Sequence, residues 1–228
     1  MKNQLLAALP IEEYQNLAPH LESVELPLRQ VLHEAGEPIE YVYFPTEAMI
    51  SLVSIMKDGS TVEVALIGRE GMVGIPVILG GDSTTSQAVV QVAGRGLRLQ
   101  ANILKAHFQL GGQLHYLLLR YIQALFTQVS QGAVCNRLHN LEERLARWLL
   151  SVQDCLQMQE FPMTQEHIAQ MLGSRRSGVT VAAGMLQHAG IISYRRGRIN
   201  ILSRERLEAT SCECYGIIKA EIARLLNE

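Results

Sequence analysis

The 228-residue sequence has no apolar run of the roughly 18 residues that a membrane-spanning helix needs. Residues 1–17 carry a short apolar patch, but they lack the long apolar segment and the small-residue cleavage site of a signal peptide. They are typical of an amphipathic helix instead. We therefore expect a protein that works in the cytoplasm and makes no contact with a membrane.

Cysteine is scarce as well, and the common catalytic motifs are missing. The four cysteines are scattered through a chain whose 48% hydrophobic residues suffice for a core without disulfides, which favours a reducing compartment. The sequence has no phosphate-binding loop, no dinucleotide-binding glycine motif after a strand, no HExxH and no nucleophile spaced to pair with a base. These absences argue against an enzyme.

The net charge is only −2, which by itself does not suggest a nucleic-acid-binding protein. The charges are unevenly distributed, however. Residues 156–206 hold 7 Lys and Arg against 3 Asp and Glu, whereas residues 1–155 hold 11 against 15 and residues 207–228 hold 2 against 4. Positive charge is thus concentrated in about fifty residues, as binding to nucleic acid requires.

The region from residue 24 to about residue 99 is typical of short strands punctuated by Gly, Pro and Asp. The clearest strands are 41–45, 49–56 and 61–67. Asp58-Gly59 stands between two of them and predicts a hairpin. Many short strands at this spacing predict a barrel or a jelly roll. Before them, residues 5–19 predict one short helix that ends near Pro19.

Residues 163–202, MTQEHIAQMLGSRRSGVTVAAGMLQHAGIISYRRGRINIL, are typical of a winged helix-turn-helix. Thr164 is placed to cap the first helix, Gly173 stands where the turn needs a positive φ, and Gly190 ends the second helix. The residues of the second helix expected to face the core are Val179, Ala182, Ala183 and Leu186. Because such a module places its second helix in the major groove, the sequence predicts binding to double-stranded DNA.

The amino-terminal end of that second helix is the end that approaches the base edges. The expected DNA contacts are Thr164, Gln165, Arg175, Arg176, Ser177 and Thr180 on the helices and Arg195, Arg196 and Arg198 on the wing. Arg176 is the best candidate for a bidentate bond to guanine, whereas Arg175 suits a phosphate equally well. The wing arginines are expected to contact phosphates, which position the module without reading sequence.

The periodicity between about residue 103 and residue 159 is helical. In the first long helix, apolar positions recur at spacings of three to five, and the residues expected in a dimer interface are Leu118, Ile122, Leu125 and Val129. The alternative is a core helix packed on its own barrel. In a second helix, over residues 141–157, Leu145, Trp148, Leu149 and Val152 share one face.

The barrel with GREGMVG at 68–74, the long helix and the winged helix together resemble the Crp/Fnr family of bacterial transcription regulators over nearly the whole chain. The resemblance implies an α+β fold: an amino-terminal β-barrel or jelly roll, a long dimerisation helix and a carboxy-terminal winged helix-turn-helix. The expected boundaries are 1–110, 111–136 and 137–228. A homodimer reading a pseudo-palindromic DNA site is also implied, with RNA polymerase as a further candidate partner. The family's guanine-reading arginine falls on Arg176, and Ser177 replaces the glutamate frequent in the family, so a different preferred site is expected.

The barrel departs from the pattern of the cyclic-AMP binders in that family. Their Gly-Glu-x-Gly turn is Gly71-Met72-Val73-Gly74 here, and Met72 cannot accept the hydrogen bond of the ribose hydroxyl. Their Arg-Ser-Ala is Ser86-Gln87-Ala88 here, which removes the charged contact to the cyclic phosphate unless Arg69 or Arg95 replaces it. The candidate effector pocket is Gly71, Met72, Val73, Gly74, Ser86 and Gln87. We expect no cofactor and no control by cyclic AMP; the alternative is a sensor whose barrel binds another small molecule that gates DNA binding.

The cysteines and histidines offer little for other sensor chemistries. An iron–sulfur member of the family needs a cysteine cluster near the amino terminus, whereas the first cysteine here is Cys135, and the seven histidines are too dispersed to suggest a haem ligand. Cys212-x-Cys214 has the chemistry to bind metal or to respond to oxidation, but it lacks the second pair expected of a zinc site. We expect a packed carboxy-terminal helix there and no metal.

Overall fold

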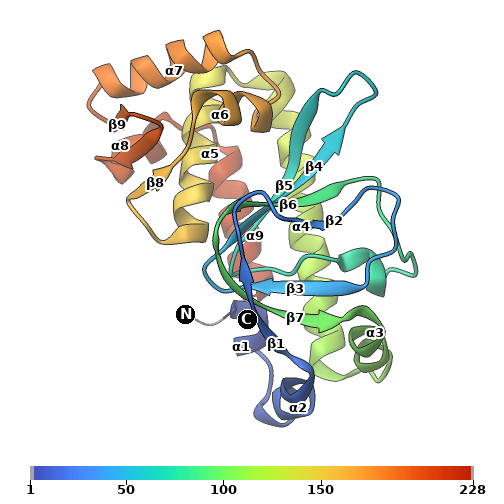
Figure 1. The fold of residues 1–228 in the computed structure, drawn as a ribbon. Helices are drawn as coiled ribbons and strands as arrows, with labels where there is room; N and C mark the ends of the chain where they lie inside the picture. Colours follow the sequence, from blue (N-terminus) through green and yellow to red (C-terminus); the bar gives the residue numbers. More distant parts are fainter. Residues whose placement is uncertain (1–2, 227–228) are drawn as a thin grey trace.

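The computed structural model describes residues 3–226 (Figure 1). The chain begins with α1 (Gln4–Ala7), α2 (Ile11–Leu17) and the 3₁₀ turn η1 (Ala18–His20). The single helix predicted over residues 5–19 is therefore wrong. Pro10 interrupts it, because a proline cannot donate the backbone hydrogen bond of a helix interior and stands instead at the amino-terminal cap of α2.

Strands β1 to β7 form the amino-terminal jelly-roll barrel that was predicted (Figure 1). They are β1 (Glu22–Leu26), β2 (Val31–His33), β3 (Tyr41–Pro45), β4 (Met49–Ile55), β5 (Thr61–Ile67), β6 (Gln87–Val92) and β7 (Gly94–Gln100). One antiparallel sheet has the order β1-β7-β3 and the other has the order β2-β6-β4-β5. The predicted hairpin joins β4 to β5, where Gly59 has a φ of +82°. Leu26 of the first sheet packs with Ile50 and Val90 of the second in one buried cluster.

Three helices follow the barrel. They are α3 (Ala101–Gln109), α4 (Gly112–Leu138) and α5 (Leu141–Leu156). Gly111 caps the start of α4, and both Gly111 and Gly112, the first residue of α4, have positive φ. Asn140 caps α5 through reciprocal hydrogen bonds with Glu143. The helix expected over residues 111–136 is therefore present as α4, and its role in dimerisation stays a prediction. Among residues 3–226, none of the helices is both long and apolar enough to cross a bilayer.

Helix α4 has apolar residues on two faces. Leu118 is fully buried in the core between barrel and helices, and Leu125 is buried beside Leu66 of β5. The expectation that these two leucines lie in a dimer interface is corrected, because the chain's own barrel already covers them. Of the other two predicted interface residues, Ile122 is half-buried and Val129 is 40% exposed.

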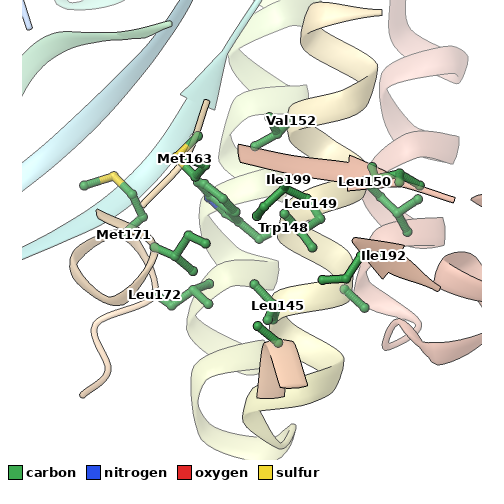
Figure 2. Packing of buried hydrophobic residues seen from close by; sticks show 14 of the residues in the cluster. Leu145, Trp148, Leu149, Leu150, Val152, Met163, Met171, Leu172, Ile192 and Ile199 are labelled. Carbon is green, nitrogen blue, oxygen red and sulfur yellow. The ribbon is translucent and has the colours of Figure 1, made fainter. Parts of the chain in front are cut away.

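The carboxy-terminal part is a winged helix packed around α5. Its elements are β8 (Glu160–Pro162), α6 (Gln165–Met171), α7 (Arg176–His188), β9 (Ile192–Arg195), β10 (Arg198–Ile201), α8 (Arg204–Thr210) and α9 (Cys214–Leu226). The predicted face of α5 is confirmed, since all four of its residues are buried. Figure 2 shows Trp148 and Leu149 of α5 close to Ile199 of β10 in this core. Helix α9 then returns to lie along α4 (Figure 1).

The winged helix and the barrel share a core. Met49 and Val53 of β4 and Leu66 of β5 belong to the same buried cluster as Trp148 and Leu172 of the winged helix. Close packing of this kind transmits small displacements, because side chains of the two parts pack against one another in this cluster. A displacement of β4 and β5 is therefore expected to displace α5 and α6 as well.

Candidate nucleic-acid interface

The first helix of the module, α6, is held by its cap and by the turn that follows it. The Thr164 hydroxyl accepts a hydrogen bond from the backbone N–H of His167 (3.2 Å), so the predicted cap is confirmed. Gly173 has a φ of +56°, as predicted for the turn. A Cβ at this position would stand 3.1 Å from Val62 of the barrel, so both the backbone and the neighbouring strand favour glycine.

The second helix, α7, buries one side and exposes the other. Its predicted core residues Val179, Ala182, Ala183 and Leu186 are all buried. Arg175, Arg176, Ser177 and Thr180 are exposed. The helix lies at the edge of the molecule, away from the barrel strands (Figure 1). Arg175 is the amino-terminal cap, and its side chain makes no capping hydrogen bond. The first-turn N–H groups and the positive end of the helix dipole therefore add to the charge of the two arginines, an arrangement that attracts phosphate.

Two apolar residues on this exposed side were not among the predicted contacts. Val181 is 64% exposed and Met185 is 51% exposed. They follow Ser177 at intervals of four residues, which places all three on one side of α7. Apolar side chains in that position suit the methyl group of thymine. The interval of four was the signal in the sequence that could have identified them.

A hydrogen bond joins two of the predicted contact residues across the two helices. The hydroxyl of Thr180 donates to Oε1 of Gln165 (2.7 Å) and also lies 3.0 Å from the carbonyl oxygen of Arg176. Gln165 is thereby oriented through its oxygen, and its amide nitrogen remains the group that can donate to a base or a phosphate.

The wing is a two-residue hairpin between β9 and β10. Arg196 (φ +49°) and Gly197 (φ +73°) both have positive φ, the combination of a type I′ turn. Arg195 and Arg196 are exposed at its tip. Arg198 instead forms an ion pair with Glu160 of β8, so its predicted phosphate contact would have to compete with this carboxylate. Arg195 and Arg196 are therefore better placed than Arg198 to contact phosphate, because Arg198 is already paired with a carboxylate.

The residues predicted for an effector pocket do not share one environment in the structure. Met72 is fully buried in the cluster that contains Leu118, whereas Val73 is fully buried in the barrel cluster. The hydroxyl of Tyr121 on α4 donates to the carbonyl of Met72 (3.0 Å), and its ring packs against Gly71. The turn at residues 71–74 is thus fixed against α4.

The remaining members of that set lie on β6 and the loop before it. Ser86 is half-buried, and Nε2 of Gln87 donates to a carboxylate oxygen of Glu34 (2.6 Å). Arg95, considered as a replacement phosphate ligand, forms a surface ion pair with Glu47 (2.8 Å). Gln87 and Arg95 are therefore each paired with a carboxylate of the chain itself.

A groove of about 460 Å³ lies between the barrel and α6. Arg29 and Gln87 line the barrel side, and Thr164 and His167 line the helix side. Burial lowers the pKa of His167, and the charge of Arg29 lowers it further, so the imidazole is neutral at pH 7. The groove brings a residue predicted for effector binding close to one predicted for DNA binding.

Glu63 of β5 connects the barrel to α5 by hydrogen bonds. Nε1 of Trp148 donates to one carboxylate oxygen of Glu63 (2.8 Å), and the hydroxyl of Ser51 donates to the other. Burial raises the pKa of Glu63 to about 7, although the hydrogen bonds from Ser51 and Trp148 and the charge of Arg147 act in the opposite direction. This carboxyl therefore changes its protonation near neutral pH, at the junction of the two parts.

We predict that ionisation of Glu63 lowers the free energy of unfolding as the pH rises through 7. Because the pKa of Glu63 is raised from 4.5 to about 7 on folding, the folded chain holds this proton more tightly than the unfolded chain. The stabilisation is complete below about pH 4.5 and is lost as the pH rises through about 7, a decrease of roughly 3 kcal/mol in the free energy of unfolding. Glu63→Gln keeps an oxygen for Trp148 but cannot ionise, so it is expected to lack this decrease.

Urea unfolding of both proteins across this pH range, followed by the fluorescence of the single tryptophan, measures the difference. In the folded wild type, the fluorescence of Trp148 is also expected to titrate with a midpoint near 7, and in Glu63→Gln it is not. If the two proteins differ in unfolding free energy by the same amount at every pH, Glu63 does not titrate here.

The comparisons with known proteins agree with this architecture. Residues 23–109 match the model of the cyclic nucleotide-binding domain, and residues 143–210 match that of the Crp-like helix-turn-helix domain. Among solved structures, FixK2 from Bradyrhizobium japonicum is similar at 18% identity and a TM-score of 0.73, covering 84% of this chain and 98% of its own. Curated proteins give no match to the sequence.

Two further solved structures share the fold. The c-di-GMP-responsive global regulator CLP of Xanthomonas campestris is 13% identical with a TM-score of 0.70, covering 85% of this chain and 100% of its own. A CRP-family transcriptional regulator from Thermus thermophilus is 19% identical with a TM-score of 0.67, covering 82% of this chain and 96% of its own. With a cyclic nucleotide-binding domain followed by a helix-turn-helix domain that binds DNA, the chain belongs to the Crp/Fnr family of transcription regulators.

Proposed function

We propose that this regulator binds a pseudo-palindromic site in double-stranded DNA as a homodimer, each chain placing α7 in the major groove. The observation that carries the proposal is the exposed start of α7, where Arg175, Arg176, Ser177 and Thr180 meet the positive end of the helix. Arg176 reads a guanine, and Arg195 and Arg196 of the wing contact phosphates. Gln165 adds a donor beside Thr180.

The open face of α4 supports the dimer. Its apolar residues, which we call the α4 seam, are Leu119, Ile122, Phe126, Val129 and Ala133. Their alternating spacings of three and four are those by which two helices pack as a coiled coil. Phe126 is 72% exposed, which leaves a large aromatic side chain in water unless a second surface covers it. Pairing of two seams is expected to present the two α7 helices to half-sites about one DNA turn apart.

The barrel is proposed not to respond to cyclic AMP. Met72, at the position of the ribose-binding glutamate, is a buried apolar residue. Gln87, close to where the cyclic phosphate is held in the family, is bonded to Glu34, whose negative charge would repel a phosphate. No cofactor is therefore proposed for the barrel.

The alternative is a sensor in which another small molecule, bound at the barrel, gates DNA binding. It is favoured by two contacts: Tyr121 of α4 packs on Gly71, and Trp148 of α5 bonds to Glu63 of the barrel. A ligand that displaced these strands would move both helices. Since CLP is described as responsive to c-di-GMP, cyclic dinucleotides belong among the ligands to be tested. Contact with RNA polymerase stays a prediction.

Selection of bound sequences from random duplex DNA, with purified protein and no added ligand, tests the proposal. We expect a two-fold symmetric motif with half-sites about ten base pairs apart, unchanged when cyclic AMP is added. A motif that emerges only after a ligand is added would favour the sensor. An enriched motif without symmetry would contradict the homodimer, and no enrichment under either condition would contradict sequence-specific binding.

A further inference from the structure

Three cysteines and a histidine from distant parts of the chain meet at the carboxyl end of α4. Cys135 lies in the last turn of α4 and His139 is the residue that caps it. Cys212 lies between α8 and α9, and Cys214 is the first residue of α9. The three sulfur atoms and an imidazole nitrogen all lie within 4.8 Å of one another. The expectation that Cys212-x-Cys214 lacks a second pair of donors is therefore wrong, because Cys135 and His139 provide one.

The distances fit a tetrahedral metal site. Sγ of Cys135 lies 3.5 Å from Sγ of Cys212, and Sγ of Cys214 lies 3.6 Å from Nδ1 of His139. With zinc–sulfur bonds of about 2.3 Å, two ligands of a tetrahedral zinc ion lie about 3.8 Å apart. The interval of four between Cys135 and His139 brings both donors to the same side of the end of α4. All four ligand positions of such a site are filled by side chains.

The surroundings of the four residues are also those of a metal site. The second imidazole nitrogen of His139, Nε2, lies 3.1 Å from a carboxylate oxygen of Glu213. Metal-binding histidines commonly donate their other N–H to a carboxylate, which fixes the ring and its tautomer. Arg144 and Arg147 lie beside Cys135, and their charge offsets the single negative charge that three thiolates and a divalent ion leave.

We propose that Cys135, His139, Cys212 and Cys214 bind one zinc ion, which fastens the segment between α8 and α9 to the end of α4. Three thiolates and one imidazole in a closed tetrahedron are the donor set of a structural zinc site. The three cysteines form a buried cluster of their own, apart from the apolar clusters that hold the barrel and the winged helix. The ion thus connects α4, which carries the proposed dimer seam, to the chain that leaves the winged helix.

Elemental analysis of the full-length protein tests the site. The protein is purified with a reductant, without chelator and without a metal-binding tag, and zinc is measured per chain. We expect one zinc ion per chain in the wild type and almost none in Cys135→Ser or Cys214→Ser. Cys155→Ser is the matched control: it changes the one cysteine outside the cluster, which lies near Glu70, and it is expected to keep the full zinc content.

A second variant keeps the test decisive if the serine variants fail to fold. His139→Cys offers four thiolates and is expected to bind one metal ion as a folded protein. After replacement of zinc by cobalt, its sulfur-to-cobalt absorbance should exceed that of the wild type by about one third, since four thiolates replace three. A structural effect of the substitution alone would not change this absorbance.

The proposal is overturned if reduced, folded wild-type protein contains no zinc and binds neither zinc nor cobalt. It is equally overturned if the protein contains iron in place of zinc, or if Cys155→Ser loses the metal as the cluster variants do. A Cys135–Cys212 disulfide in protein alkylated without air would likewise replace the metal site by a redox pair.

Discussion

Replacing Phe126 with glutamate is expected to yield a folded monomer that binds the selected DNA about 10²- to 10⁴-fold more weakly than the wild type. Phe126 lies at the centre of the α4 seam and is 72% exposed in the single chain, so the substitution removes no contact of the monomer's own core. A buried, unpaired carboxylate is costly, and two would face each other in a symmetric seam. The weaker binding follows because a monomer engages one half-site at a time.

Light scattering after gel filtration measures the mass of the protein, and fluorescence anisotropy measures its affinity for the DNA. Leu110→Glu is the matched control, because Leu110 is 82% exposed, lies between α3 and α4 outside the seam, and undergoes the same change. It is expected to remain a dimer with wild-type affinity. A dimeric Phe126→Glu with unchanged affinity would place the dimer interface elsewhere.

The sequence alone does not show which apolar side of α4 is exposed. The periodicity of α4 identified a long apolar helix correctly, but Leu118 and Leu125 on one side are as apolar as Leu119 and Phe126 on the other. Which side meets the barrel depends on where β5 and α9 pack, and those contacts come from segments far away in the sequence. Only the structure shows that Leu118 and Leu125 are buried in the chain's own core and that Leu119 and Phe126 are exposed.

Features set by neighbouring residues were predicted better. The cap at Thr164, the turn at Gly173 and the end of α7 at Gly190 depend on local backbone geometry, and all three are as predicted. The first helix was the exception, since Pro10 stands within an otherwise helical apolar pattern. The second half of the cysteine cluster could not be seen locally, because Cys135 precedes Cys212 by 77 residues and the return of α9 along α4 brings them together.

The surroundings of Met72 show the same limit at the barrel. The substitution of methionine for glutamate was visible in the sequence and argued against a ribose contact. Its burial in the cluster with Leu118 was not, because it depends on the packing of the turn against α4. The residue type thus shows which chemical groups a position offers. It does not show which element the side chain packs against.

Replacing Arg176 with alanine is expected to lower the affinity of the dimer for its selected DNA at least about 30-fold. A bidentate arginine–guanine contact contributes about 1–3 kcal/mol of discrimination, and a symmetric dimer loses it twice. Arg176 is exposed in the first turn of α7, and that helix is held by Val179, Ala182 and Leu186 on its buried side, so the protein should fold normally.

The decisive measurement is the ratio of affinities for the selected sequence and for unrelated DNA, taken at several salt concentrations. Arg176→Ala should reduce this ratio at the guanine position, whereas Arg196→Ala in the wing should weaken binding to both DNAs equally and lower the salt dependence by about two phosphate contacts, one from each chain. The two arginines differ in this way because one approaches base edges from the end of α7 and the other approaches the backbone from the wing tip. If Arg176→Ala weakened binding to both DNAs equally, Arg176 would be a phosphate contact, and the reading of sequence would pass to Ser177, Thr180 and Val181 on the same exposed side of the helix.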